Sequence, residues 1–161
     1  DPDEGRSLGV LEAVSGAQRP TFPPQRAKDW TPEAGFQAMN TLLDNYGEVV
    51  TAVICANDQL ALGAISAISA RGLRVPEDIS VVGFDDNPIS HHSLPPLTTV
   101  AQDFVGLGGL AFQTLKRRID GEPVESSQGL SPHLIVRQST APPNPNRGLL
   151  LPNKKAAFPA G

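Results

Sequence analysis

Two strongly apolar segments on either side of a helix-like segment constrain the fold of this chain more than any other feature. Residues 49–56 and 79–84 are rich in β-branched side chains and are apolar at both odd and even positions. Strands with this pattern are covered on both faces, as in parallel sheets. Between them, apolar residues recur at helical spacing, namely Leu60, Leu62, Ile65 and Ile68. This order predicts a right-handed β-α-β crossover and a parallel sheet.

Three further helices and two further extended segments are expected around this unit. Residues 6–17 carry leucines and valine at helical spacing, and Thr31 and Pro32 form a start signal for a helix that ends before Gly47. Asp103 is placed to cap a third helix that closes at Gly121. The two extended segments are residues 95–100 and 134–138.

The size of the chain predicts one domain with a loose end. The 161 residues, 39% of them hydrophobic, are enough for a single core. We expect a domain over residues 1–140 and a Pro- and Asn-rich, disordered tail over residues 141–161. The predicted class is α/β, with a mainly parallel sheet and helices on both faces.

Composition excludes several functions for this chain on its own. Thirteen basic residues against 17 acidic ones give a net charge of −4, which leaves no basic excess for binding nucleic acid. No apolar run approaches the ~20 residues that cross a bilayer, and no basic-then-apolar leader opens the chain. We therefore expect a soluble, cytoplasmic protein. The single Cys55 excludes an intrachain disulfide and is interpreted as a small apolar residue of a buried strand.

Catalytic and metal-binding motifs are absent from the sequence. It contains no Gly-x-Ser-x-Gly, no His-Glu-x-x-His and no phosphate-binding glycine run. Asp86, His91 and His92 could be considered as metal ligands, but adjacent histidines in a Pro-flanked loop rarely converge with a carboxylate. We predict that the protein is not an enzyme and uses neither a metal nor a cofactor.

Two polar residues follow the two apolar strands directly. Asn57 and Asp85 are expected at the same edge of the sheet, because parallel strands end on one side, and ligands of such sheets bind there. Alternatively, Asn57 and Asp58 cap the next helix, while Asp85 and Asp86 shape a turn. The spacing alone does not decide between the two interpretations.

Trp30 stands at the entrance of a predicted helix, outside any apolar stripe. Its indole could cover the apolar face of a sugar ring, or it could fix the chain where it enters the helix. Local pattern favours the second role.

The order of these residues resembles the C-terminal part of the effector-binding domain in the lactose-repressor (LacI/GalR) family of bacterial transcription regulators. The resemblance lies in residues 51–63 (TAVICANDQLALG), 72–86 (GLRVPEDISVVGFDD) and 95–100 (PPLTTV). Asp29-Trp30 before Gly35-Phe36, and Gln102-Asp103-Phe104, are similar to the member that gives the family its name. The likeness extends over residues 6–140.

The resemblance implies a periplasmic-binding-protein-like fold and a role for specific residues. Arg6 and Asp85 would bind sugar hydroxyls, Asn57 would add a polar contact, and Trp30 would stack on a sugar face. Gln102 and Phe104 would line the same pocket. Val10 departs from the family's usual aromatic residue, and Asp1 to Gly5 do not match the family's segment before the arginine.

The implied function is that of a ligand-sensing fragment of a repressor-type regulator. Its partners would be a small sugar or glycoside, a second copy in a homodimer, and operator DNA through an N-terminal domain that this chain lacks. The alternative is a sugar-binding protein of a transport system, which has a similar two-lobed fold. A doubly wound enzyme is a third and weaker hypothesis.

Overall fold

A computed structural model describes residues 2–16, 21–124 and 129–147 of the chain. The α-helices are α1 (Pro2–Gly16), α2 (Pro32–Tyr46), α3 (Asp58–Ala70) and α4 (Phe104–Ile119), and a short 3-10 helix, η1, spans Pro88–His91. The strands are β1 (Ala52–Ile54), β2 (Ser80–Asp85), β3 (Thr98–Ala101) and β4 (His133–Ile135). This order confirms the predicted α/β class.

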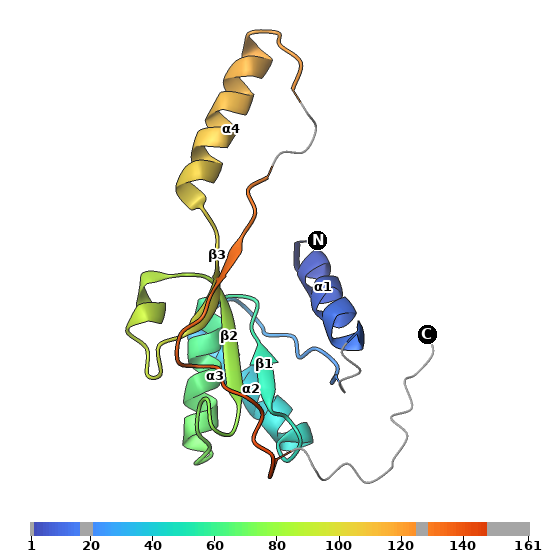
Figure 1. Cartoon of the computed structure of the whole chain (residues 1–161), viewed down its shortest axis with the longest axis vertical. Helices are drawn as coiled ribbons and strands as arrows, with labels where there is room; N and C mark the ends of the chain where they lie inside the picture. Colours follow the sequence, from blue (N-terminus) through green and yellow to red (C-terminus); the bar gives the residue numbers. More distant parts are fainter. Residues whose placement is uncertain (1, 17–20, 125–128, 148–161) are drawn as a thin grey trace.

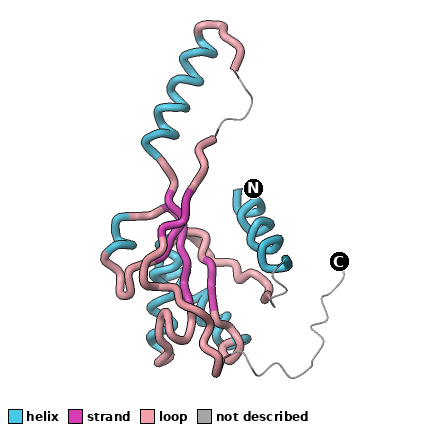
Figure 2. The backbone as a smooth tube through the Cα atoms, viewed as in Figure 1, coloured by secondary structure: helices cyan, strands magenta, loops and turns pink. Residues whose placement is uncertain are grey.

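The four described strands form one sheet in the order β1-β2-β3-β4 (Figure 2). β1 pairs with β2 and β2 with β3 in parallel, and β4 runs antiparallel to β3. The predicted crossover is therefore present: β1, α3 and β2 follow one another, and the two strands are direct neighbours. Because the parallel strands share one direction, the chain leaves all three at the same edge of the sheet.

The hydrophobic core lies between the sheet and a layer made of α3 and α2. Its fully buried side chains include Met39 of α2, Ile68 of α3, and Val81 and Leu97 from β2 and the segment before β3. Figure 1 shows α2 and α3 together at the sheet, whereas α1 stands apart from it and α4 projects beyond it. The surface between α2, α3 and β2 therefore supplies most of the apolar burial.

The helix starts follow the local sequence. Thr31 is the N-cap of α2 and accepts a hydrogen bond from the backbone N–H of Ala34 at 3.3 Å, with Pro32 as the first helical residue. Asp103 likewise caps α4 and accepts from the N–H of Gly106 at 2.8 Å. Both caps satisfy donors that the first turn of a helix leaves unpaired.

The expectation for the first strand was wrong in two respects. β1 covers Ala52–Ile54 instead of residues 49–56, and Ile54 is 56% exposed, although the apolar pattern predicted cover on both faces. β1 is the edge strand of the described sheet, so only β2 pairs with it there. The ladder with β2 reaches Cys55, whose N–H donates to the Val82 carbonyl at 2.8 Å, and the chain then turns into α3 at its N-cap Asn57.

Part of the predicted tail is held by hydrogen bonds in the described structure. Ser80 Oγ donates to the carbonyl of Ala141 at 3.1 Å, and Arg147 donates to the carbonyls of Gly47 and Val50. Residues 148–161 lie outside the described part of the chain. The predicted boundary at residue 140 stays a prediction.

Two glycines allow α2 and α3 to approach backbone to backbone. A Cβ on Gly63 would clash with the carbonyl oxygen of Pro32 and lie 2.6 Å from the N atom of Phe36. A Cβ on Gly35 would lie 2.7 Å from the Cα atom of Leu60. The close crossing of the two helices therefore depends on small residues at both contact points.

We predict that Gly63→Ala lowers the free energy of unfolding by about 1–3 kcal/mol, because the added methyl group has no space between the helices. Urea denaturation of the purified chain measures this change. Gly108→Ala is the matched control, since no atom lies within 4 Å of a Cβ at Gly108 in α4. Equal unfolding free energies for the wild type and Gly63→Ala would contradict the close packing of α2 on α3.

Candidate functional site

The carboxyl ends of the three parallel strands bring polar residues from distant parts of the chain to one edge of the sheet. Ile54 is in register with Val82, and Asp85 is in register with Ala101. Asn57 comes shortly after β1, Asp85 is the last residue of β2, and Gln102 follows β3 directly. We call Asn57, Asp85 and Gln102 the strand-end rim.

Asn57 connects the rim to the segment that carries Trp30. Its Oδ1 accepts a hydrogen bond from the N–H of Leu60 at 2.8 Å, so Asn57 is the N-cap of α3. Its Nδ2 donates to the carbonyl of Trp30 at 3.2 Å. The capping alternative thus holds for Asn57, while Asp58 is the first residue inside the helix and not the cap. A contact between Asn57 and a ligand stays a prediction.

Trp30 is 51% exposed and lies in the chain between Asp29 and Thr31, which are hydrogen-bonded to each other. The Asp29 carboxylate accepts hydrogen bonds from the Thr31 hydroxyl at 2.5 Å and from the Thr31 N–H at 3.0 Å. The hydroxyl bond, followed by the backbone bond, lowers the pKa of Asp29 below its ordinary value. The ionised carboxylate therefore holds the turn around the exposed indole at neutral pH.

Asp85 and Gln102 pair directly across β2 and β3. Gln102 Nε2 donates to Asp85 Oδ1 at 2.8 Å. Asp85 has a φ angle of 104° and Asp86 one of 52°, a backbone region that residues with a side chain rarely adopt. The bend after β2 therefore depends on contacts from the surrounding structure to keep its shape.

The neighbouring Asp86 has a different role. Its Oδ1 lies 2.5 Å from Nη2 of Arg137, whose side chain is only 11% exposed, and 3.5 Å from Nε2 of His91. Arg137 also donates from Nη1 to the carbonyl of Leu97 at 2.7 Å. Asp86 thus ties the segment after β4 to the bend, in agreement with the turn-shaping alternative for this residue.

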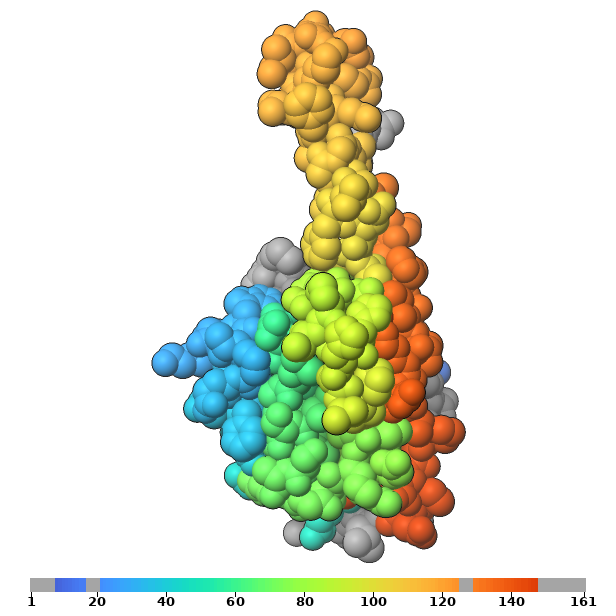
Figure 3. Space-filling model, turned by 90° about the vertical axis from the view of Figure 1, so that its left-hand side faces the viewer, coloured from blue at the N-terminus to red at the C-terminus, as the bar shows by residue number. Residues whose placement is uncertain are grey.

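Phe104 lies next to the rim at the start of α4 and is 56% exposed. Its N–H donates to the carbonyl of Gln102 at 3.0 Å. None of the described residues of α4 is buried, and Figure 3 shows the helix, in gold, extending beyond the body of the molecule. Phe104 thus faces solvent here, and its place in a ligand pocket stays a prediction.

Arg6 lies on α1, which stands apart from the sheet in Figure 1. Its side chain is outside the part of the structure whose side chains are described. The structure therefore pairs Asn57 with Trp30 and Asp85 with Gln102, and it places Phe104 next to Gln102. It tests no contact of Arg6, whose role stays a prediction.

Sequence reasoning missed the buried contacts behind the rim. Arg137 lies 51 positions from Asp86, and its predicted setting was an ordinary last strand. No local pattern marks such a pair. Asp58, with 1% exposure and hydrogen bonds to three segments, was considered only as a helix cap. Its position at the start of a helix gave no sign of its contacts with β3, η1 and the bend.

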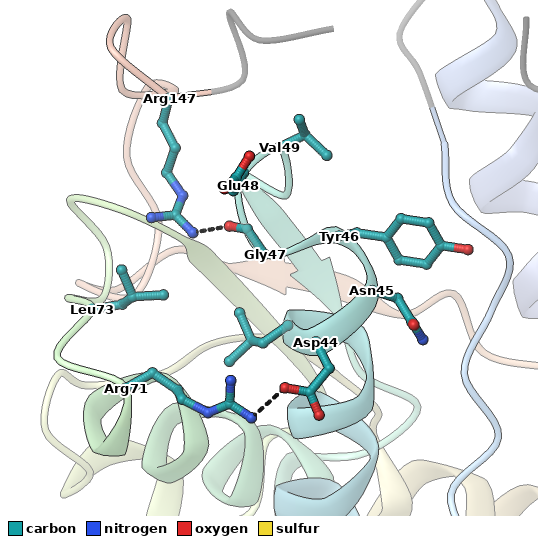
Figure 4. Close-up of a pocket in the computed structure, with 10 residues that line it drawn as sticks. Asp44, Asn45, Tyr46, Gly47, Glu48, Val49, Arg71, Leu73 and Arg147 are labelled. Atoms are coloured by element: carbon teal, nitrogen blue, oxygen red, sulfur yellow. Dashed lines mark hydrogen bonds and ion pairs between the residues drawn. The ribbon is translucent and has the colours of Figure 1, made fainter. Parts of the chain in front are cut away.

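A hollow of about 610 Å³ lies at the other end of the sheet from the strand-end rim, where the chain enters β1. Figure 4 shows the residues that line it. It is lined by the end of α2, the segment leading into β1, and residues after α3. The two guanidinium groups in it are already bound: Arg71 contacts Asp44 at 2.7 Å and Arg147 donates to the Gly47 carbonyl. These contacts join the end of α2 to α3 and to the C-terminal segment, which is a structural role.

Within residues 2–16, 21–124 and 129–147, no group of three His, Cys, Asp or Glu side chains is arranged to hold a metal ion. None of the helices in these ranges is long and apolar enough to cross a membrane.

The strand order and the parallel register define an α/β domain of the open-sheet type, and its polar strand ends lie at the edge where such sheets bind ligands. The sequence matches the family described as "Periplasmic binding protein-like domain" over residues 1–140, and the chain belongs to this family.

Regulators of the lactose-repressor type are among its relatives. The chain is 46% identical over 120 residues to the lactose operon repressor of Escherichia coli (strain K12), which covers 74% of this chain and 33% of that protein. It is 41% identical over 148 residues to the HTH-type transcriptional regulator reg1 of Streptomyces lividans, which covers 90% of this chain and 42% of that protein. The family resemblance seen in the motifs is thereby confirmed.

Solved structures agree with this assignment. The lac repressor dimer bound to operator and the anti-inducer ONPF superposes with a TM-score of 0.79 at 40% identity, covering 84% of this chain and 46% of that one. The complex of the transcriptional regulator CelR with cellobiose gives a TM-score of 0.75 at 37% identity, covering 83% and 41%. The chain thus spans less than half the length of each of these four relatives, which are transcription regulators and not enzymes.

Cys55 follows β1 and is partly buried against the hydrophobic core. Burial, and next the charge of Asp58, raise the pKa of the Cys55 thiol from 9.0 to about 12. Only the thiolate reacts with alkylating agents. The structural role expected for this cysteine is consistent with its setting.

We predict that iodoacetamide alkylates Cys55 of the folded chain at least about tenfold more slowly than that of the urea-unfolded chain at pH 9. Mass spectrometry of quenched samples measures both rates. The unfolded thiol loses its proton at lower pH than the folded one, so stability should also fall as pH rises from about 9 towards 12. Equal alkylation rates in the two states would contradict the raised pKa.

Proposed function

We propose that this chain is the ligand-sensing part of a repressor-type transcription regulator that responds to a small sugar or glycoside. The observation that carries the proposal is the strand-end rim: a carboxylate and two carboxamides lie at the edge of a parallel sheet, and one of them is hydrogen-bonded to the backbone of Trp30, whose side chain is half exposed. Open parallel sheets bind their ligands at this edge.

The residue types at the rim suit a polyhydroxylated ring. The ionised carboxylate of Asp85 accepts hydrogen bonds from sugar hydroxyls, and such charge-assisted bonds are stronger than neutral ones. The flat, apolar face of Trp30 covers the C–H face of a sugar ring. Asn57 adds a polar contact, Gln102 and Phe104 line the pocket, and the Arg6 guanidinium contributes the complementary donors.

The chain forms one wall of the binding cleft, and the rest of the complete protein supplies the other. The chain spans 46% of the operator-bound repressor structure and 41% of the cellobiose-bound regulator. α4 exposes a series of large apolar side chains, which are Phe104, Val105, Leu107, Phe112, Leu115 and Ile119. An exposed apolar surface of this size is normally covered by another part of the protein, and a second subdomain would provide that cover.

The ligand acts without any bond being made or broken. It must bind one arrangement of the two subdomains better than the other, because only that difference in affinity can alter the affinity for DNA. Coupling free energies of roughly 1–3 kcal/mol are typical of such effects.

The partners of the complete protein follow from the same proposal. A homodimer contacts operator DNA through a segment outside this chain, whose own net charge is −4. The repressor relative was solved as a dimer on its operator, which supports this arrangement. A regulator of this kind works in the cytoplasm. The named relatives are regulators, and this favours the proposal over a transporter's sugar-binding protein.

In the complete protein, Asp85→Asn should weaken sugar binding by about 10- to 100-fold, because it removes the charge from the strongest acceptor at the rim. Trp30→Ala should weaken it by about tenfold through the loss of aromatic cover. Calorimetric titration with ONPF and with cellobiose, the ligands named in the two related structures, measures both effects. Ser66→Ala, on the exposed side of α3, is the control and should bind as the wild type does. Unchanged affinity in both rim variants would remove Asp85 and Trp30 from the pocket.

The 161-residue chain by itself should bind these sugars only weakly, in the millimolar range, because it holds a single wall of the cleft. Chemical-shift changes in a ¹⁵N NMR titration measure such affinities. Micromolar or tighter binding would contradict the half-cleft arrangement.

A further inference from the structure

Asp58 is a buried carboxylate that the proposed sugar contacts do not use. It is 1% exposed and is the first residue of α3. Its Oδ1 accepts a hydrogen bond from the Thr99 hydroxyl at 2.6 Å, and its Oδ2 accepts from the Ser90 hydroxyl at 2.5 Å and from the Asn87 N–H at 2.7 Å. Burial of a charge is costly unless it is hydrogen-bonded, and three donors compensate this one.

The three donors come from three different segments. Thr99 belongs to β3, Ser90 to η1, and Asn87 to the bend that follows β2. The carboxylate also lies against the backbone of β2, because a Cβ at Gly83 would be 3.2 Å from Asp58 Cγ and would clash with Oδ1. Asp58 therefore connects α3, η1, the bend and both inner strands at a single point.

The hydrogen bonds of Asp58 hold the bend at Asn87, directly after Asp85 and Asp86, the two residues with positive φ angles. The N–H of Asn87, directly after Asp85 and Asp86, donates to Asp58 itself. The N–H of Asp86 donates to the Thr99 hydroxyl at 3.4 Å, and this hydroxyl in turn donates to Asp58. Positive φ angles at two consecutive aspartates persist only where the surroundings impose them.

We propose that Asp58 is a positioning residue: through Thr99 and the Asn87 N–H it sets the conformation of the Asp85-Asp86 bend, and so holds Asp85 where it meets Gln102 and the ligand. The effect on the ligand rests on the proposed function, whereas the effect on the bend does not. The Thr99 hydroxyl is the intermediate that passes the constraint to Asp86.

A purely structural role for Asp58 makes different predictions. If it only stabilised the core, any substitution with an equal loss of stability would act on the rim in the same way. Met39→Ala provides this comparison, because Met39 is 1% exposed and belongs to α2, away from the bend. Thr99→Ser keeps the hydroxyl that Thr99→Val removes, so this pair isolates the hydrogen bond from the packing.

The test is ¹⁵N NMR of the 161-residue chain without ligand. Thr99→Val should speed amide hydrogen exchange at Asp86 by at least about tenfold and move the side-chain amide signals of Gln102 towards those of a free glutamine. Asp58→Asn, which cannot accept from all three donors, should do the same at Asp86 and Asn87. Thr99→Ser and Met39→Ala should leave the Gln102 signals at their wild-type positions.

Unchanged Gln102 signals in Thr99→Val would overturn the proposal, even if Asp58→Asn failed to fold. So would equal shifts in Thr99→Val and Met39→Ala, because stability alone would then explain them. In the complete protein, Thr99→Val should weaken binding of ONPF or cellobiose about tenfold, and Thr99→Ser should not. If the wild-type protein binds neither sugar, the proposed function fails for these ligands, and the signals of Gln102 and Asp86 still decide the role of Asp58.

Discussion

The parallel pairing of β1, β2 and β3 is the constraint on which the rest of this structure depends. It sends the chain out of all three strands at one edge, where Asp85 pairs with Gln102 and Asn57 follows the neighbouring strand. An antiparallel partner in the middle of the sheet would place one of these residues at the far end. The crossover through α3 makes the parallel arrangement possible, because it returns the chain to the start of β2. α3 in turn packs closely against α2 in the hydrophobic core.

Much of this arrangement could be predicted because its signals are local. β-branched apolar runs marked β2 and the centre of β1, and Thr31 and Asp103 marked two helix starts. From the strand order it followed that Asn57 and Asp85 share an edge. The extent of β1 was misjudged because an apolar pattern cannot report whether a strand has one neighbour or two.

The contacts that shape the edge could not be predicted, because they join residues far apart in the chain. Asp58 reaches Thr99 across 41 positions, and Asp86 reaches Arg137 across 51. A buried carboxylate at a helix start looks the same in sequence as an exposed cap. The local pattern favoured a structural role for Trp30, and only the family resemblance pointed to a ligand role for Trp30 and Gln102. The hydrogen bonds of Trp30 with Asn57, and of Gln102 with Asp85, place both at the edge.

A crystal structure of the complete protein with its bound sugar tests the central claim most directly. The account predicts sugar hydroxyls within hydrogen-bond distance of the Asp85 carboxylate and the Asn57 carboxamide, with the ring against Trp30. A sugar bound in the hollow near Arg71 and Arg147, or away from the ends of β1 and β2, would contradict it.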